Sequence, residues 1–331
     1  MRLLRFLLLI FSALAMAIAA AGYWWATKPL VLRTSPADFR IAPGSGLRVA
    51  AQQVADAGVD LPPVLLVLLA KTVRAETTIK AGSYSVNSGV TPWEILGKLT
   101  RGQVTQGDIT LVEGWTLRQW RDRVDAHPDL LHDSRDVPDA EILRRIGGEG
   151  SSIEGRLFPD TYLFDKHSSD FDLFARASRA MDKKLAIEWE RRAPGLPYQN
   201  VYQALTMASI VEKETGRLGD RPMVAAVFVN RLRAGMLLQT DPTVIYGLGE
   251  KFDGNLRKRD LTSDTPYNTY TRAGLPPTPI AMPGLASLQA ALHPADSDAL
   301  YFVARGDGSS QFSRSLDEHN RAVNRYQRGI K

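Results

Sequence analysis

The sequence predicts an α+β protein with a single N-terminal transmembrane helix, a small α/β module and a larger mixed α+β domain. Three observations lead to this prediction. An uncharged apolar segment lies near the N-terminus, and short strand patterns alternate with amphipathic helix patterns after it. The 331 residues, of which 44% are hydrophobic and 23% are charged, are also enough to build folded domains with proper cores.

The transmembrane helix is predicted over residues 6–25, which contain no charge and are long enough to cross a bilayer. Two arginines precede this segment, and the aromatic residues Tyr23–Trp25 close it. This pattern favours a retained anchor, with residues 1–5 in the cytoplasm and the rest of the chain on the other side of the membrane. A cleaved signal peptide remains the alternative, because small residues at 19–21 resemble a cleavage site.

The composition excludes several classes of site. The chain has no cysteine, which excludes disulfides, thiol catalysis and zinc–thiolate sites. Its five histidines show no metal-ligand spacing, so we expect no metal and no other cofactor. The net charge of +5 comes from basic residues interspersed with acidic ones, which gives no support to a nucleic-acid partner.

A polar tether is expected at residues 26–38, and a small α/β module over residues 39–107. The Gly82–Ile95 segment of this module resembles the start of a LysM module, a small peptidoglycan-binding fold. Thr91 is the expected N-cap of a helix that would bury apolar side chains. These side chains are Trp93, Ile95, Leu96 and Leu99. The alternative is that glycine, threonine and tryptophan are only turn, cap and core residues here, without a ligand.

The larger domain is expected over residues 108–331. It begins with another strand, turn and helix, in which Thr116 is the expected N-cap. Helical, charged sequence follows over residues 134–193 and is interrupted at residues 153–162. The charged residues of this interruption read either as the lining of a cleft or as structural ion pairs and caps. They are Glu154, Arg156 and Asp160.

A helix predicted over residues 198–214 is apolar on nearly every side, yet it ends in Glu212 and Glu214. Burial raises the pKa of a carboxyl, and the negative end of a helix dipole acts in the same direction. A carboxyl in such a place is therefore suited to general acid catalysis. A rotation of about 100° per residue places the two glutamates on opposite faces, so periodicity leaves open which one faces a cleft.

The next segments collect the groups that a sugar polymer needs. A second helix is expected over residues 223–234, and a turn is predicted at Asp241-Pro242. Residues 267–270 and 274–280 add amide, hydroxyl and aromatic side chains in proline-stiffened loops. Such loops bind a ligand without a large loss of conformational entropy. The candidates to bind sugar are Gln239, Thr240, Asp241, Tyr246, Asn268, Tyr270 and Glu214.

Five motifs stand in a specific order along the chain. They are Ala208–Thr215, Asn230–Arg233, Leu238–Gly247, Tyr267–Tyr270 and Gly274–Pro277. As a set, they closely resemble the endolytic murein transglycosylase family (YceG-like). The resemblance implies a single-pass enzyme of the bacterial inner membrane whose catalytic domain lies in the periplasm. It also implies that Glu212 is the catalytic glutamate.

The resemblance further implies a reaction that cleaves the bond between N-acetylmuramic acid and N-acetylglucosamine without water. Glu212 would protonate the glycosidic oxygen and then take the proton of the C6 hydroxyl, which leaves a 1,6-anhydromuramic acid end. The implied substrate is the glycan strand of peptidoglycan. The implied partners are peptidoglycan synthases (penicillin-binding proteins), and the implied role is to end the elongation of nascent strands.

Two other functions remain open from the sequence. A muramidase-type hydrolase would need a second carboxyl beside Glu212, and Asp241 or Glu214 are the candidates. A peptidoglycan-binding scaffold would instead tether cell-wall synthases through the LysM-like region at residues 39–107.

Overall fold

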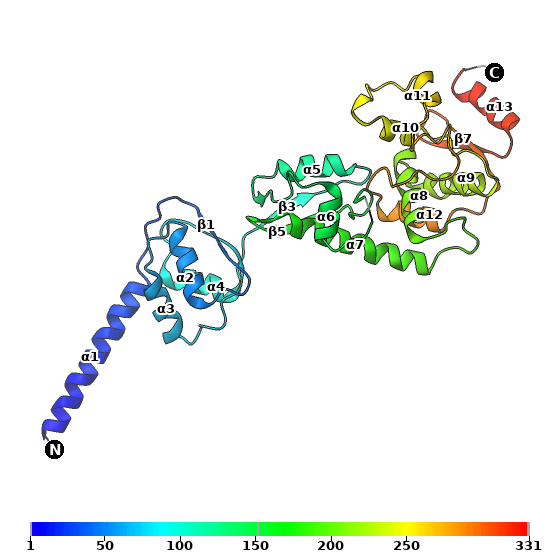
Figure 1. Cartoon of the computed structure of the whole chain (residues 1–331). Coiled ribbons are helices and arrows are strands. Elements are labelled where there is room, and N and C mark those ends of the chain that lie inside the picture. Colours follow the sequence, from blue (N-terminus) through cyan, green and yellow to red (C-terminus); the bar gives the residue numbers. More distant parts are fainter. Residues whose placement is uncertain (1, 151, 330–331) are drawn as a thin grey trace. The chain divides into compact units, whose positions relative to one another are not determined.

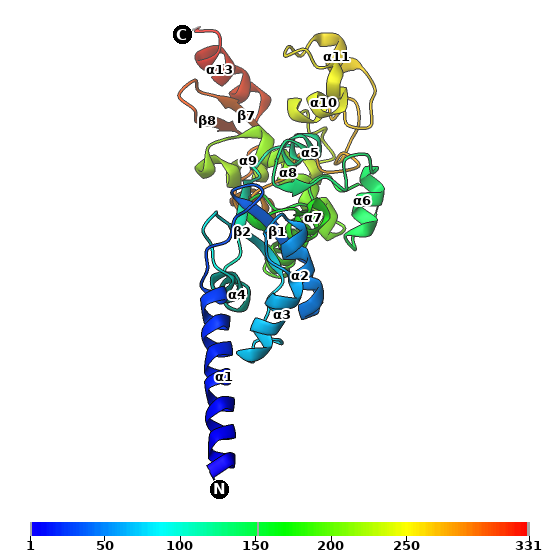
Figure 2. The same cartoon turned by 90° about the vertical axis from the view of Figure 1, so that its left-hand side faces the viewer.

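The structure is a computed structural model that describes residues 2–150 and 152–329. It is a mixed α+β fold, as the sequence predicts, and helices predominate (Figures 1 and 2). Its strands are β1 (Ala37–Ile41), β2 (Gly82–Val86), β3 (Gln106–Thr110), β4 (Leu130–Leu131), β5 (Thr161–Asp165), β6 (Ser168–Ser169), β7 (Tyr301–Ala304) and β8 (Ser310–Ser313).

The helices fall into an N-terminal and a C-terminal set. The first set is α1 (Arg2–Ala26), α2 (Leu47–Asp56), α3 (Pro63–Thr72), α4 (Pro92–Arg101), α5 (Leu117–Asp125), α6 (Asp139–Arg145) and α7 (Asp170–Glu190). The second set is α8 (Val201–Glu214), η1 (Leu218–Asp220), α9 (Arg221–Arg233), α10 (Asp241–Leu248), η2 (Gly249–Lys251), α11 (Lys258–Thr262), α12 (Leu285–Leu292) and α13 (Leu316–Tyr326).

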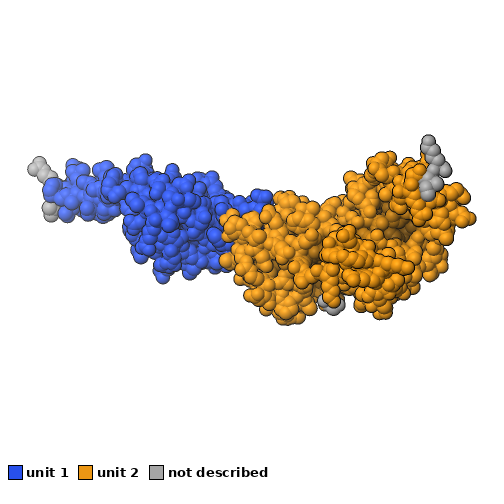
Figure 3. Space-filling view, turned by 90° about the horizontal axis from the view of Figure 1, so that it is seen from above, with its two compact units in different colours: residues 1–108, 163–168 blue, residues 109–162, 169–331 orange. Residues whose placement is uncertain are grey.

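The chain divides into two compact units (Figure 3). Unit 1 contains residues 1–108 and 163–168, and unit 2 contains residues 109–162 and 169–331. The strands form four small sheets of two strands each within the described residues, in the pairs β1-β2, β3-β5, β4-β6 and β7-β8. Because no large sheet is present among them, the cores depend mainly on helix packing.

Helix α1 has the length and composition of a membrane span. Its segment Leu4–Ala26 is 23 residues long with a mean hydropathy of 2.3, and none of its most apolar window is buried against the protein. The helix ends where the Thr27 hydroxyl donates a hydrogen bond to the Tyr23 carbonyl at 2.8 Å. The predicted N-terminal apolar helix is therefore present and fits a single-pass membrane anchor.

Unit 1 is built around the antiparallel pair β1-β2. Phe39 lies opposite Tyr84 in the register, and their rings stack with centroids 5.7 Å apart. Helices α2 and α4 pack on this pair, and α3 packs against both helices. Thr91 caps α4 as predicted, because its hydroxyl accepts the Glu94 N–H while the Glu94 carboxylate accepts the Thr91 N–H.

The prediction that Trp93 is buried is wrong. Its side chain is 52% exposed, whereas Ile95, Leu96 and Leu99 are buried. The reason is helical periodicity: Trp93 projects roughly 110° away from the centre of the stripe formed by the other three side chains. An aromatic surface of unit 1 therefore remains available to solvent.

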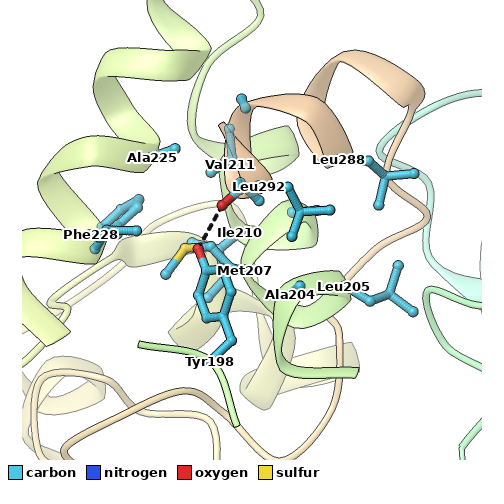
Figure 4. Close-up of a cluster of buried hydrophobic side chains, with 14 of the residues drawn as sticks. Tyr198, Ala204, Leu205, Met207, Ile210, Val211, Ala225, Phe228, Leu288 and Leu292 are labelled. Atoms are coloured by element: carbon cyan, nitrogen blue, oxygen red, sulfur yellow. Dashed lines mark hydrogen bonds between the residues drawn. The ribbon is translucent and has the colours of Figure 1, made fainter. Parts of the chain in front are cut away.

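Unit 2 has its core where α8, α9 and α12 pack against one another. Figure 4 shows side chains from these three helices, such as Val211, Phe228 and Leu292, converging in this core. The Tyr198 hydroxyl donates to the Ala291 carbonyl at 2.9 Å and ties the chain before α8 to α12. Helix α8 begins at Val201, after the predicted position 198, because the Asn200 side chain accepts the Gln203 N–H and caps it.

Asp241-Pro242 does not form the predicted turn. These two residues are the first turn of α10, where a proline lacking its N–H is tolerated and an aspartate complements the helix dipole. Thr116 caps α5 as predicted, through a capping box with Gln119. Thr116 and Asp241 both have side chains that favour the first turn of a helix. Only Asp241-Pro242 suits a turn as well as a helix start, and the prediction fails there.

Candidate active site

Helix α8 carries the predicted catalytic residue at the end of a buried segment. Every residue of Ala204–Val211 is buried, and the Ser209 hydroxyl accepts the Ile280 N–H at 3.0 Å. Glu212 follows directly in the last helical turn. The position of its side chain is therefore fixed by a rigid, buried helix, as a catalytic group requires.

The Glu212 carboxylate is held by two donors. Arg221, the first residue of α9, donates from Nη2 to Oε1 at 2.9 Å, and the backbone N–H of Gly284 donates to Oε2 at 3.0 Å. Both side chains of this ion pair are only 5% exposed. Arg221 has two further nitrogens, Nε and Nη1, that are buried without a hydrogen-bond partner among the described residues. Its charge is therefore balanced mainly by nearby carboxylates.

A second carboxyl, that of Glu113, lies beside this pair. Burial and the charge of Glu212 raise the pKa of Glu113, while the Arg221 guanidinium acts in the opposite direction. The Glu113 carboxyl also lies directly against Gly284, where an added Cβ would come within 2.0 Å of its Oε1. Gly284 thus allows both carboxyls to approach one backbone position.

The segment that follows Glu113 covers one side of Glu212. Gly114 has a positive φ of 74°, and a Cβ there would lie 3.7 Å from Glu212 Cγ. Its N–H donates to the Met282 carbonyl at 2.9 Å, and its carbonyl accepts the Lys213 ammonium at 3.1 Å. This close packing explains why the Glu212 side chain is so little exposed.

Glu214 lies in a different environment. It accepts the Thr240 hydroxyl at 2.7 Å, and burial raises the pKa of its carboxyl, opposed by this hydrogen bond. The Tyr270 hydroxyl donates to Asp241 at 2.5 Å nearby, and the negative charge of Asp241 adds to the rise. One network therefore contains Glu214, Thr240, Asp241 and Tyr270. Glu212 is contacted by other residues.

The remaining predicted loop residues mainly hold the loops. Asn268 is buried and donates its amide to the carbonyls of residues 260, 261 and 263. Thr240 is buried as well, and its N–H donates to the Thr269 hydroxyl. Gln239 is exposed, adopts a φ of 50°, and accepts a hydrogen bond from Arg231 at 3.3 Å. Among these, Gln239 alone presents its side chain broadly to solvent.

A cavity of about 1090 Å³ opens in unit 2. Its walls come from α5 and α10, and it includes Lys213, the residue after Glu212. Tyr246, Tyr267 and Ile280 add apolar surface to the lining. The two tyrosine rings meet edge to face with centroids 4.9 Å apart. A cavity of this size with aromatic walls can accept saccharide units.

Glu154 lines this cavity and also accepts the N–H of Leu117 at the start of α5, so both the cleft and the cap interpretations hold for this residue. It is 4% exposed, and it accepts hydrogen bonds from the Leu117 N–H at 3.0 Å and the Tyr246 hydroxyl at 3.1 Å. Burial raises the pKa of Glu154 to about 7, although both hydrogen bonds act to lower it. Glu154 is therefore a buried carboxyl that changes protonation near neutral pH.

One group in the described part of the chain has the composition of a metal site. The ligand atoms of Asp125, His132 and Asp170 lie within 4.8 Å of one another. Asp170 stands at the start of α7 and accepts two hydrogen bonds from Ser134, one of them from its hydroxyl at 2.7 Å. The His132 Nδ1 and Asp170 Oδ1 atoms are buried without a hydrogen-bond partner among the described residues, and Glu212 is not a member of the group.

Sequence reasoning missed the residues that contact Glu212 in space. Gly284 is 72 positions away, and Glu113 is further still. Arg221 lies two positions before the helix predicted over residues 223–234, where the sequence gives it no signal beyond the start of a helix. A glutamate directly before the Gly114 turn was the one available signal for Glu113, and it is indistinguishable from an exposed loop charge without the fold.

Known proteins resemble this chain over most of its length. A model of the YceG-like family matches residues 39–325. A Bacillus subtilis protein named endolytic murein transglycosylase is 34% identical over 271 residues, which cover 76% of this chain and 74% of that protein. A Streptococcus pneumoniae protein with the same name is 28% identical over 281 residues, which cover 75% of this chain and 50% of that protein.

A solved structure shows the same relationship. The crystal structure of a yceG-like protein from Listeria monocytogenes matches with a TM-score of 0.56 and 33% identity. The match covers 86% of this chain and 97% of that one. The family resemblance seen in the sequence motifs is thereby confirmed.

Proposed function

This chain belongs to the YceG-like family, and we propose that it is an endolytic murein transglycosylase in which Glu212 is the general acid and then the general base. The observation that carries this proposal is the position of Glu212, a desolvated carboxyl at the end of a buried helix, oriented by Arg221 and the Gly284 N–H. Relatives with the name of this activity align with most of the chain.

In the proposed reaction, Glu212 donates a proton to the oxygen between N-acetylmuramic acid and N-acetylglucosamine. The bond from C1 to this oxygen breaks, and the N-acetyl group of the muramic acid stabilises the electron-poor carbon. Arg221 and the Gly284 N–H stabilise the carboxylate that Glu212 becomes. Glu212 then accepts the proton of the C6 hydroxyl, whose oxygen bonds to C1. A 1,6-anhydro ring results, and Glu212 regains its proton.

We assign the sugar contacts according to exposure. Tyr246 lines the cavity, and Gln239, Asp241 and Tyr270 have side chains that solvent reaches. In the proposal these four contact the glycan strand. The other three candidates, Thr240, Asn268 and Glu214, hold the loops in place instead. Their polar groups already form hydrogen bonds within the protein: Thr240 donates to Glu214, and Asn268 donates to three carbonyls.

The other parts of the chain have proposed roles in the same process. Helix α1 is a retained inner-membrane anchor, and the remainder of unit 1 and all of unit 2 lie in the periplasm. Unit 1 is a LysM-like glycan-binding module in which the exposed Trp93 offers a flat face to a pyranose ring. The partners are peptidoglycan synthases, and the cleavage ends the elongation of nascent strands.

A muramidase-type hydrolase is the second candidate, and one observation favours it. A hydrolase needs two carboxyls, and Glu113 supplies one beside Glu212. The predicted partners Asp241 and Glu214 belong to the network around Thr240 and Tyr270. If the protein hydrolyses its substrate, Glu113 is therefore the second carboxyl.

Product analysis separates the two reactions. Full-length protein in detergent is incubated with peptidoglycan in water enriched in oxygen-18, and the products are weighed by mass spectrometry. The transglycosylase gives 1,6-anhydromuramic ends without heavy oxygen. Reducing ends that carry the heavy isotope would show hydrolysis and contradict the proposal. A sample without enzyme controls for spontaneous cleavage.

A further inference from the structure

Glu154 is a buried carboxyl that the proposed reaction does not use. It lies in the wall of the cavity, and no cation forms an ion pair with it among the described residues. Its partners are neutral donors: the Leu117 N–H, the Tyr246 hydroxyl and the Gly155 N–H. Burying a carboxyl without a cation costs free energy, and carboxyls with pKa values perturbed in this way cluster at functional sites. Its place in the cavity wall suggests that the purpose concerns a ligand.

The pairing with Tyr246 gives Glu154 control over the hydrogen-bonding character of the cavity. When Glu154 is ionised, the Tyr246 hydroxyl donates to it and presents only lone pairs to Thr278 and to the cavity. When Glu154 is protonated, its O–H can donate to Tyr246, and the phenolic hydrogen is released to point towards the cavity. The same tyrosine is then a donor to a ligand.

We propose that Glu154 and Tyr246 form a saccharide subsite that binds an acetamido carbonyl, and that the proton on Glu154 turns Tyr246 from an acceptor into a donor for this group. A carbonyl oxygen accepts hydrogen bonds and cannot donate, so it binds only the donor form. The edge-to-face ring of Tyr267 adds apolar surface beside the subsite. The subsite rests on the proposed function, since acetamido sugars are the units of the proposed substrate.

The charged and titratable surroundings support a proton on Glu154 near neutral pH. Burial raises its pKa to about 7, and the charge of Asp139 in α6 adds to the rise. Tyr202 in α8 also faces Glu154, and its own pKa is raised mainly by burial. The Tyr246 pKa is raised as well, so this residue stays a hydroxyl. The cations that line the same cavity are Arg118, Arg121, Arg135 and Lys213.

Three of these cations are already paired with carboxylates. Arg121 pairs with Asp139 at 2.5 Å, Arg118 with Glu250 at 2.5 Å, and Arg135 with Asp125 at 3.8 Å. Lys213 donates to the Gly114 carbonyl at 3.1 Å. Their charges are therefore engaged elsewhere, and the protonation of Glu154 is governed by burial.

The test is a binding experiment that does not depend on turnover. Full-length protein in detergent is titrated with chitotetraose, which carries an acetamido group on every ring and lacks the muramic acid that the proposed reaction needs. Cellotetraose, which lacks acetamido groups, is the matched control ligand. Dissociation constants are measured by calorimetry from pH 5.5 to pH 8.5, conditions chosen to bracket the value of about 7 for Glu154.

The wild-type protein is expected to bind chitotetraose about tenfold more weakly at the alkaline end, the value of one lost hydrogen bond. Cellotetraose binding should not change with pH. Glu154→Gln keeps a neutral donor towards Tyr246, so its chitotetraose affinity should equal that of the acidic wild type at every pH. Tyr246→Phe should bind weakly at every pH. Circular dichroism and thermal melting confirm that these near-isosteric variants fold.

Three results would overturn the proposal: a flat wild-type pH profile, a pH-dependent profile that persists in Glu154→Gln, or no binding of chitotetraose. A merely structural role of Glu154 predicts the first or the second result. The outcome is separable from that of the product analysis. Anhydro ends with a flat binding profile would remove only the subsite, while the predicted profile with hydrolytic products would remove only the proposed reaction.

Discussion

The last turn of α8 contains two glutamates, Glu212 and Glu214, whose side chains lie in contrasting surroundings. Glu212 meets a cation, a backbone N–H and the second carboxyl of Glu113. Glu214, two positions later, meets the neutral hydroxyl of Thr240, and burial raises its pKa. The difference teaches that a carboxyl at a helix end acquires its role from the residues that approach it, and that burial alone does not assign it.

The largest effect is expected from Arg221→Met, which removes the cation that pairs with Glu212. This change leaves the Glu212 carboxylate without its cation in a site where both side chains are 5% exposed. We expect a loss of about 3–5 kcal/mol in the free energy of unfolding, together with loss of activity. Urea unfolding and release of anhydro-ended glycans measure the two quantities. A stability within about 1 kcal/mol of the wild type would contradict the ion pair.

Gly284→Ala should change activity more than stability. The new Cβ would lie 2.0 Å from Glu113 Oε1, so the flexible Glu113 side chain must move away. We expect turnover to fall by roughly tenfold, while the free energy of unfolding changes by less than about 1 kcal/mol. The control is the double variant Gly284→Ala with Glu113→Ala. It removes the clash, so its turnover should be no lower than that of Gly284→Ala alone. Unchanged turnover in Gly284→Ala would show that the position of Glu113 is unimportant.

Thr240→Val tests the Glu214 side. Valine has the shape of threonine but cannot donate to Glu214, so one partly buried hydrogen bond is lost. The expected destabilisation is about 1 kcal/mol, with turnover close to that of the wild type. Thermal melting measures the first effect and glycan release the second. A loss of turnover as large as that of Gly284→Ala would place the Thr240 network in the reaction.

The smallest effect is expected from the pH dependence of Glu214. Its folded pKa is raised above the unfolded value, so its contribution to stability is present at acidic pH and is lost as the pH rises through the folded pKa. Glu214→Gln removes this titration. Relative to this variant, the wild type should melt lower at alkaline than at acidic pH, by roughly one or two degrees. The opposite sign would show that Glu214 is stabilised as an ion.

Local signals in the sequence predicted local features well. The caps at Thr91 and Thr116, the apolar N-terminal helix and the buried helix before Glu212 all depend on residues close in sequence. Trp93 was misplaced because its side chain lies at the margin of an amphipathic stripe. At Asp241-Pro242 the sequence analysis predicts a turn, but these residues begin α10, because proline and aspartate suit the first turn of a helix as well as a turn.

The candidate site was predictable only in part. The ordered motifs led to Glu212 and Tyr246, but periodicity placed Glu212 and Glu214 on apolar faces of equal quality. What separates them comes from distant positions: Glu113 and Gly284 on one side and Thr240 on the other. Contacts between segments so far apart in the chain leave no periodic or spacing signal in a single sequence.

The most direct test of the central claim compares Glu212→Gln with Glu214→Gln in the full-length protein. Both changes keep the shape and remove the exchangeable acid, and release of anhydro-ended glycan from peptidoglycan is the readout. We predict that Glu212→Gln loses at least about a hundredfold in rate while keeping its fold, and that Glu214→Gln stays within about threefold of the wild type. Wild-type activity in Glu212→Gln, or an equal loss in both variants, would contradict the assignment of Glu212.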